Sequence, residues 1–175
     1  IYQLGEHRLM CGDSTKEEDV KKLMDNQKAD LAITDPPYNV DYEGGTGLKI
    51  QNDKMEDAAF VNFLTDAFRQ MKNSLKDGGA YYIWHADTNR YAFSQALLEN
   101  EMKERQNLIW VKSSLVMGRQ DYQWKHEPCL YGWKAGAAHY FIDDFTNTTV
   151  LEDLPNINAM TKDELKNEIK ELRKI

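Results

Sequence analysis

The chain has 175 residues, which is enough for one domain with a substantial core and too few for two full domains. Hydrophobic residues make up 41% and charged residues 29%, a balance that excludes low-complexity disorder and fibrous classes. The net charge of −7 argues against a generally basic nucleic-acid binder. Residues 1–60 are strongly acidic, however, while residues 100–140 carry a small basic excess. A nucleic acid would therefore contact the second stretch.

No apolar run approaches the length of a membrane-spanning helix, and the N-terminal residues lack the basic and then apolar pattern of a signal peptide. We therefore expect a cytoplasmic protein that contacts no membrane. Cys11 and Cys129 are far apart and belong to no cluster of Cys and His, so neither a disulfide framework nor a metal site is predicted. Both cysteines are expected to be buried thiols.

The first part of the chain predicts a strand, a helix and a second strand. Residues 7–12 form a short apolar run that ends in a glycine, as in a buried strand followed by a turn. Thr15 and Glu18 have the spacing of a capping box, and a helix is predicted over residues 16–26. Residues 29–34 form another apolar segment, which leads directly into two prolines that cannot continue a sheet.

The middle of the chain continues this alternation after a polar, glycine-containing loop at residues 39–54. Apolar residues at helical spacing predict helices at residues 60–75 and 89–100, and Gly78 and Gly79 are expected to end the first of them. Short apolar segments predict strands at residues 80–84, 108–111, 129–133 and 139–142, the last two as a pair.

Strands that alternate with helices predict an α/β fold whose sheet is mostly parallel with an antiparallel end. Residues 1–150 are assigned to one domain. Residues 151–175 hold an amphipathic helix that begins at a capping box of Thr161 and Glu164 and places Leu165 on its apolar face. This helix would pack on the domain or reach toward another segment or a second copy.

Asp35-Pro36-Pro37-Tyr38 follows a predicted strand, at the position where open α/β sheets bind ligands. Aspartate supplies a hydrogen-bond acceptor, a carbonyl between prolines is held rigidly, and tyrosine offers a flat apolar face. Two acceptors beside an aromatic ring suit the exocyclic amino group of a planar base, because they would orient its N–H groups and aim its lone pair at an electrophile. By itself, the same tetrapeptide is also typical of a simple turn.

The segments around this tetrapeptide favour function. TDPPYNV is preceded by LMCGDS and followed by LKDGGAYYIW, LIWVK and HEPCLYGWK. Together, over about residues 7–142, they resemble the amino-group DNA methyltransferases of the permuted class, in which the catalytic half comes first. The resemblance implies a Rossmann-like sheet, S-adenosyl-L-methionine as cofactor, and double-stranded DNA with a flipped target base as substrate.

Carried over residue by residue, the resemblance assigns catalysis to Asp35, Pro36, Pro37 and Tyr38. Asp35 and the Pro36 carbonyl would bind the target amino group. Tyr38 would stack on the extruded base, and Pro37 would shape the turn. Methyl transfer would be direct and would require no cysteine.

The resemblance also places Asp13 and Ser14, together with Asp35, at the cofactor. Asp13 matches a position beside the adenosyl group, although an aspartate there could equally cap the following helix. Asp35 carries a preference for adenine, because family members that act on cytosine more often have serine at this position.

Four residues of the later, more basic stretch are assigned to DNA binding: Lys112, Arg119, Lys125 and His126. For the basic side chains, the alternative is an ordinary solvated face. The resemblance makes the segment around His126 a wall of the base pocket, which disfavours general acid–base chemistry at His126 and Glu127.

One segment of the family is not found in the printed sequence. The family has a glycine-rich loop that binds the methionine part of the cofactor, and residues 1–175 contain none, so we expect an incomplete sheet. The chain also starts without methionine and ends within a predicted helix. Three explanations stay open: a trimmed longer protein, a second half supplied by another chain, or a catalytically incomplete DNA-binding or structural module.

The sequence therefore predicts a site-specific DNA methyltransferase that acts on the exocyclic amino group of adenine and uses no metal. An N4-cytosine DNA methyltransferase is the first alternative, and a methyltransferase of protein or RNA amino groups is another. A homodimer and a restriction-enzyme partner stay open.

Overall fold

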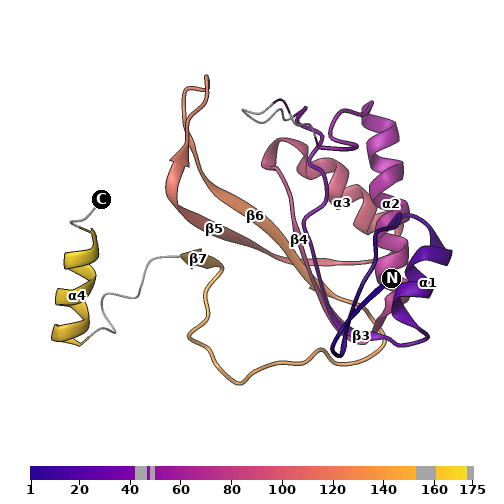
Figure 1. The fold of residues 1–175 in the computed structure, drawn as a ribbon. Helices are drawn as coiled ribbons and strands as arrows, with labels where there is room; N and C mark the ends of the chain where they lie inside the picture. The colour runs from indigo at the N-terminus through magenta and orange to yellow at the C-terminus, as the bar shows by residue number, and fades with distance from the viewer. Residues whose placement is uncertain (42–46, 48–49, 153–160, 173–175) are drawn as a thin grey trace.

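The structure, a computed structural model, describes residues 1–41, 47, 50–152 and 161–172. Its main sheet has five strands in the order β3-β4-β6-β5-β7 (Figure 1). These strands are β3 (Ala29–Thr34), β4 (Leu75–Trp84), β5 (Glu104–Val116), β6 (Trp124–Trp133) and β7 (Val150–Glu152). β3 is parallel to β4 and β5 is parallel to β7, whereas β6 is antiparallel to both its neighbours. All strands except β6 therefore run in the same direction, which confirms the predicted, mostly parallel α/β sheet.

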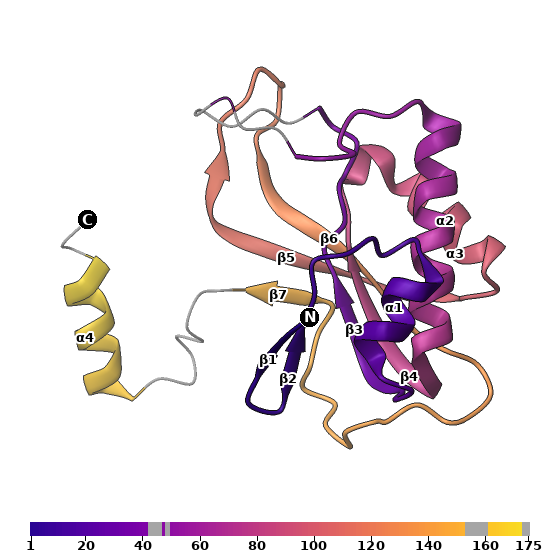
Figure 2. The same ribbon diagram turned by 45° about the vertical axis from the view of Figure 1, so that its right-hand side comes forward.

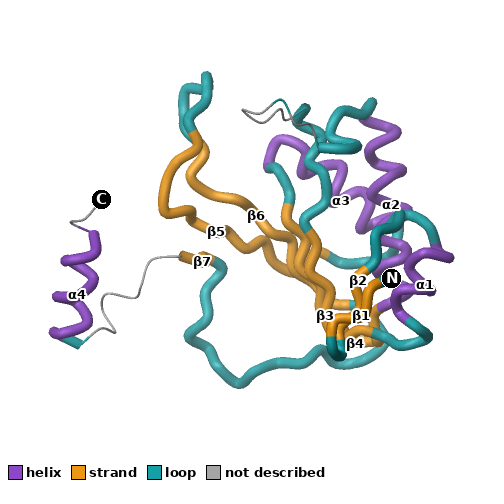
Figure 3. Tube along the Cα trace, viewed as in Figure 1, coloured by secondary structure: helices purple, strands orange, loops and turns teal. Residues whose placement is uncertain are grey.

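The antiparallel strand β6 lies inside the sheet, between β4 and β5. Tyr81 of β4 pairs with Gly132 of β6, and Leu108 of β5 pairs with Cys129 on the other side of β6. Because both edges of β6 are taken, residues 139–142 have no edge of β6 to pair with. The strand predicted at residues 139–142 is therefore wrong, and these residues belong to the long connection from β6 to β7 (Figure 3).

Two helices, α2 (Asp57–Ser74) and α3 (Arg90–Glu99), cover one face of this sheet (Figure 2). Their apolar residues recur at helical spacing and form the core with side chains from β4 and β6. The largest fully buried members of this core include Phe60, Leu64, Tyr81, Ile83, Phe93, Leu97 and Leu130. Each such side chain contributes about 1.5–3 kcal/mol by leaving water, so this layer holds the carboxyl edge of the sheet in place.

α2 ends at Ser74, before the two glycines that were predicted to stop it. Gly78 and Gly79 instead lie within β4, where Gly78 has a φ of +79° and donates its N–H to the carbonyl oxygen of Lys134 at 2.9 Å. A side chain at Gly78 would meet the backbone of Ala138. The glycines therefore allow the connection after β6 to approach β4 closely.

The N-terminal residues form a separate antiparallel pair, β1 (Tyr2–Leu4) and β2 (His7–Leu9). β2 is short and mostly exposed, so the prediction of a buried strand over residues 7–12 is wrong: among the described strands it pairs with β1 alone and takes no place in the main sheet. Cys11 follows β2 and is exposed, contrary to expectation, whereas Cys129 is buried as predicted.

The predicted first helix is present as α1 (Glu17–Met24), but its N-terminus is not capped by Thr15. The N-cap residue is Lys16, which makes no capping bond from its side chain. The Thr15 hydroxyl instead donates to the carboxylate of Asp13 at 2.7 Å. The capping-box prediction fails here because the shorter Asp13 turn takes the threonine hydroxyl.

At the other end of the chain, α4 (Lys162–Leu172) confirms the predicted helix and its capping box. The backbone N–H and hydroxyl of Thr161 both donate to the Glu164 carboxylate, at 2.8 and 2.7 Å. α4 stands apart from the main sheet in both views (Figures 1 and 2). The domain division at residue 150 stays a prediction. None of the helices in the described part of the chain is long and apolar enough to cross a membrane.

Candidate functional site

The tetrapeptide Asp35–Tyr38 leaves the sheet at the carboxyl end of β3. The strand ends at Thr34, as the two prolines require, and Asp35 is exposed at the edge where the parallel strands end. Pro36, Pro37 and Tyr38 are half-buried. The chain thus presents a carboxylate and an aromatic ring from one rigid turn.

The side chains of Asp35 and Tyr38 are hydrogen-bonded to each other. The Tyr38 hydroxyl donates to Oδ1 of Asp35 at 2.6 Å. Burial, followed by this bond and the Asp35 charge, raises the pKa of Tyr38 well above its usual range, so the hydroxyl stays a donor at neutral pH. A carboxylate accepts several hydrogen bonds, and Oδ2 of Asp35 receives none from the described residues. Asp35 therefore retains an acceptor for a ligand.

The backbone of Tyr38 is held by two side chains from distant segments, Asp53 and Asn89, which we call the Tyr38 clamp. Asp53 is buried, and its Oδ1 accepts the N–H of Tyr38 at 3.0 Å and that of Val40 at 3.4 Å. Asn89, in the short 3-10 helix η1 (Asp87–Asn89) after β4, donates to the carbonyl oxygens of Tyr38 at 2.6 Å and Asn39 at 3.1 Å. Both polar groups of the Tyr38 backbone are thus fixed by tertiary contacts.

Two further contacts hold the same turn. Asn39 and Met55 exchange a pair of hydrogen bonds between the asparagine amide and the Met55 backbone, at 2.9 and 2.5 Å. The Phe93 ring of α3 packs edge to face against the Tyr38 ring, with centroids 6.4 Å apart. The ring that would receive a base is therefore oriented before any ligand binds.

β5 and β6 carry two of the residues predicted to bind DNA, Lys112 and His126. The charge of Glu127 also raises the pKa of Tyr38, although burial and the contact with Asp35 have larger effects on that pKa. Lys112 of β5 forms an ion pair with Glu127, and the His126 ring packs edge to face on Trp124 at 5.5 Å. Lys112 therefore has a partner within the protein, and its assignment to DNA stays a prediction.

The other two predicted DNA contacts, Arg119 and Lys125, are both exposed. Arg119 lies on the turn that joins β5 to β6, and Lys125 lies at the start of β6. Among the described residues, no carboxylate lies within ion-pair distance of either side chain. Their charges are therefore available to a ligand, and their assignment stays a prediction.

Asp13 and Ser14 lie in the exposed turn before α1. The Asp13 carboxylate accepts the Thr15 hydroxyl and N–H, which lower its pKa below the ordinary value, and the Asp13 N–H donates to Asp19 at 2.8 Å. No hydrogen bond or ion pair among the described residues joins this turn to Asp35–Tyr38. The structure therefore brings the catalytic candidates together but leaves the cofactor role of Asp13 and Ser14 untested.

Two surface pockets lie beside the helices. A pocket of about 470 Å³ lies beside α2 and α3, and another of about 420 Å³ lies between α1 and α2. Neither is lined by Asp35 or Tyr38. Within the described residues, no group of His, Cys, Asp and Glu could hold a metal ion.

Sequence reasoning missed Asp53 and Asn89. Asp53 follows an asparagine in a polar loop, and Asn89 follows a strand by a few residues, so neither has a periodic or spacing signal. The one available indication is position, because Asn89 follows β4 as Asp35 follows β3, and neighbouring parallel strands bring their carboxyl ends together.

Comparisons with known proteins identify a family and a shared fold. A family model described as DNA methylase, N6_N4_Mtase, matches residues 29–174. The solved structure of M1.HpyAVI in complex with SAM is 19% identical with a TM-score of 0.55, over 87% of this chain and 67% of that one. A second structure, of M1.HpyAVI, is 17% identical with a TM-score of 0.53, over 81% of this chain and 63% of that one.

A protein from Thermus thermophilus, TTHA0409, provisionally assigned as a DNA modification methylase, is also similar. It is 19% identical with a TM-score of 0.55, over 85% of this chain and 68% of that one. At these identities the likeness shows a shared fold, and this chain spans about two thirds of the length of the structures it matches. No curated protein matches by sequence.

Proposed function

The chain belongs to the N6_N4_Mtase family of DNA methylases, and we propose that it methylates the exocyclic amino group of adenine in DNA. The observation that carries this proposal is the pair formed by Asp35 and Tyr38 at the end of β3. It places a charged acceptor beside an aromatic face on a turn that tertiary contacts hold in place. Adenine, rather than cytosine, is proposed because aspartate stands at the first position of the tetrapeptide.

Each residue of the turn has a distinct task. Oδ2 of Asp35 and the carbonyl of Pro36 accept the two N–H groups of the amino nitrogen and so aim its lone pair outward. The Tyr38 ring stacks on the base, a contact that contributes about 1–3 kcal/mol per base. The Tyr38 hydroxyl, kept protonated, holds Asp35 as a charged acceptor. Because the amino group is inaccessible inside a duplex, the base must leave the stack, which costs a few kcal/mol.

The methyl donor of this family is S-adenosylmethionine, which supplies an electrophilic methyl group when bound. Asp13 and Ser14 offer an exposed carboxylate and a hydroxyl, a donor set that suits the hydroxyl groups of an adenosyl moiety. Asp35 adds a second carboxylate at the carboxyl edge. No cysteine enters the reaction, and Cys129 is buried with its pKa raised to about 11 by that burial.

The reaction is tested by nucleoside mass spectrometry. The full-length protein is incubated with unmethylated genomic DNA and deuterated-methyl S-adenosylmethionine, and labelled N6-methyladenine is the expected product. Labelled N4-methylcytosine would show that cytosine, and not adenine, is the target, and the mechanism of transfer would stand. Absence of label in DNA from a folded protein would refute the proposed activity.

Two variants, one directly after β3 and one within it, make the test specific for the site. Asp35→Ala should lower methyl transfer by about a hundredfold or more, because the acceptor that orients the amino group is lost. Asp30→Ala is the control, since Asp30 lies at the other end of β3 and its side chain forms, among the described residues, a single exposed ion pair, with Lys76 at 2.7 Å. Equal loss in both variants would indicate damage to the strand and would contradict the assigned role of Asp35.

Tyr38 is tested by a second pair of variants. Tyr38→Phe keeps the ring and loses the bond to Asp35, whereas Tyr38→Ala loses both. Tyr38→Ala should therefore reduce transfer more than Tyr38→Phe, by at least about fivefold if stacking is worth about 1–3 kcal/mol. Equal rates in the two variants would remove stacking from the mechanism.

A further inference from the structure

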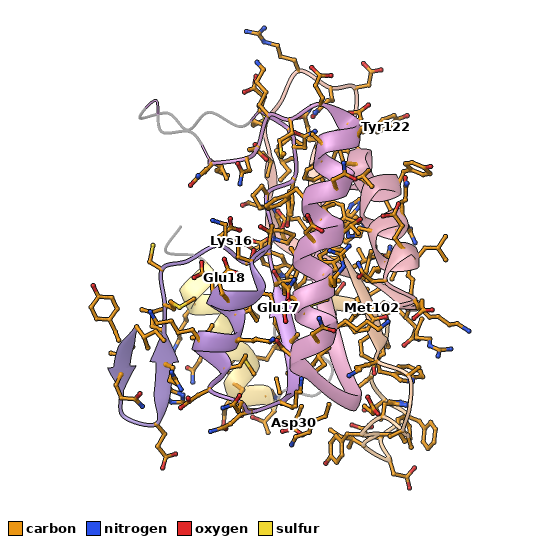
Figure 4. All side chains as sticks on the ribbon, turned by 90° about the vertical axis from the view of Figure 1, so that its right-hand side faces the viewer. Lys16, Glu17, Glu18, Asp30, Met102 and Tyr122 are labelled. Carbon is orange, nitrogen blue, oxygen red and sulfur yellow. The ribbon has the colours of Figure 1, made fainter. Side chains whose placement is uncertain are left out.

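The turn between β5 and β6, residues 117–123, projects from the same edge of the sheet as the candidate site. β5 runs parallel to β3 in the sheet order, and β6 returns antiparallel, so their connection must lie at the carboxyl edge. Figure 4 shows Tyr122 at this end of the molecule and Asp30, near the start of β3, at the opposite end. We call residues 113–123 the β5–β6 hairpin tip.

The hairpin tip exposes several large apolar side chains. Met117 is 84% exposed and Tyr122 is 89% exposed. Leu115 and Val116, just below them on β5, are about half exposed. Single exposed apolar residues are common, but several on one projecting turn indicate a surface that binds something.

The whole hairpin, from Lys112 to Lys125, carries three basic residues, Lys112, Arg119 and Lys125, against one acidic residue, Asp121. Arg119 lies between the apolar residues of the tip, and Lys125 follows them. Lys112, at the base of the hairpin, pairs with Glu127, whose charge contributes to the raised pKa of Tyr38. An excess of cationic side chains around exposed apolar ones fits a polyanion such as DNA.

The tip is held in a defined shape rather than left open. The Gln123 side chain accepts the N–H of Gly118 at 2.6 Å and donates to the carbonyl oxygen of Gln120 at 2.8 Å. Between Val111 and Val116 the register with β6 shifts, and such an irregularity re-aims the outer part of a hairpin. A turn that is fixed in this way loses less freedom when it inserts into a partner.

We propose that Met117 and Tyr122 insert into the DNA duplex and fill the space that the extruded base leaves in the stack. This inference rests on the proposed function, since an extruded base creates that space. From Lys112 to Met117 an extended strand spans about 17 Å, which exceeds the major-groove depth of about 8.5 Å. A hairpin of this length is therefore long enough to reach the base stack through the major groove. Insertion of apolar side chains between bases is a known way to stabilise an opened step.

The test uses duplexes in which the space already exists, so no recognition sequence is needed. Binding of the full-length protein is measured by fluorescence anisotropy for one duplex with a single abasic site and for the same duplex intact. We expect about tenfold tighter binding to the abasic duplex, because no base must be displaced. The double variant Met117→Ser with Tyr122→Ser should lose most of this preference while its binding to the intact duplex changes little.

Two further variants separate insertion from general effects. Tyr140→Ser is the matched control, since Tyr140 is 86% exposed but lies in the connection after β6, at the other edge. It should retain the preference. Arg119→Ala should weaken binding to both duplexes equally and reduce the salt dependence, as expected for loss of a phosphate contact.

The outcomes distinguish this inference from the proposed function. Equal binding of both duplexes by the unaltered protein would overturn insertion, as would an undiminished preference in the double variant, even if the protein methylates adenine. If the unaltered protein prefers the abasic duplex and the double variant loses this preference, insertion is supported even when no labelled methyl group appears in DNA. In that case the proposed methyl transfer is refuted and the inference about insertion stands. If the double substitution changes only the size of the free protein in gel filtration, and not its binding to either duplex, the tip is a contact between copies of the chain and insertion is refuted.

Discussion

Replacing Asn89 by alanine removes one half of the Tyr38 clamp without touching any atom assigned to the reaction. The Asn89 amide donates to the carbonyl oxygens of Tyr38 and Asn39, at 2.6 and 3.1 Å. Each net hydrogen bond contributes about 1 kcal/mol, so Asn89→Ala should lower the free energy of unfolding by about 2 kcal/mol. Because the freed carbonyls are half-buried, the turn must shift to reach water, and the Tyr38 ring will shift with it.

The kinetic effect should exceed the stability effect. A displacement of about 1 Å in a positioning group can cost about a hundredfold in rate, so we expect kcat to fall by about 10- to 100-fold. KM for DNA should change little, because phosphate contacts elsewhere dominate affinity. Urea denaturation gives the stability change, and steady-state methylation with the full-length protein gives kcat and KM.

Thr88→Ala provides the control for Asn89→Ala. Thr88 is the preceding residue of η1 and is exposed, so its truncation should leave both stability and kcat near those of the unaltered protein. If Asn89→Ala behaved like Thr88→Ala, the backbone contacts of Asn89 would have no part in positioning Tyr38. If KM rose while kcat stayed constant, Asn89 would act in DNA binding, which would also refute the positioning role.

Three further predictions concern buried groups. Tyr81 is buried, donates to the carbonyl oxygen of Lys103 at 2.8 Å, and has its pKa raised by burial to about 12. Above about pH 10 the unfolded chain releases this proton before the folded chain does, so the free energy of unfolding should fall by about 3 kcal/mol between about pH 10 and about pH 12. Tyr81→Phe should be about 1 kcal/mol less stable at neutral pH and should show a smaller fall over this range, measured by urea titration. Burial lowers the pKa of His85 below 6.5, so the unfolded chain takes up a proton first and the free energy of unfolding falls as the pH drops below 6.5. His85→Phe should reduce this loss of stability in acid. An unchanged dependence of stability on acid pH in the variant would contradict the role of His85. At about pH 8 a thiol reagent should label exposed Cys11 quickly and buried Cys129 only on unfolding, which mass spectrometry of labelled peptides will resolve.

Elements with a clear period were predictable from the sequence. The stripe of Phe60, Leu64 and Phe68 marks α2, because residues three and four apart share a helix face that must be buried. The two prolines after Thr34 mark the end of β3, because proline has no N–H for the ladder. Local rules suffice in these cases, since the interaction that decides the structure lies within a few residues.

Elements decided by distant partners were not predictable in the same way. Residues 139–142 have the apolar composition of a strand but no free edge of β6, since both edges are occupied. Residues 7–9 pair with β1 and stay outside the main sheet. Thr15 has the spacing of a cap, yet Asp13 takes its hydroxyl. When two arrangements would both satisfy the hydrogen bonds of a segment, the sequence pattern alone does not show which of them the chain adopts.

The residues of the candidate site also divide into those that were predictable from the sequence and those that were not. Asp35 and Tyr38 are close in the sequence and their chemistry could be inferred from residue type. Asp53 and Asn89 hold Tyr38 from 15 and 51 residues away, and only the fold brings these side chains to the Tyr38 backbone. Hydrogen-bonding groups of Asn and Asp occur in many loops, so the sequence offers no basis for choosing these two.

The direction of β6 is the feature that joins the two parts of the proposed activity. A strand parallel to β5 would require a crossover connection of a dozen or more residues, which would return the chain to the opposite edge before β6 could begin. Because β6 is antiparallel, a short turn suffices, and that turn must lie at the edge where Asp35 follows β3. The single reversed strand in a parallel sheet thus puts the hairpin tip and the catalytic turn on one side of the molecule, where one duplex could contact both.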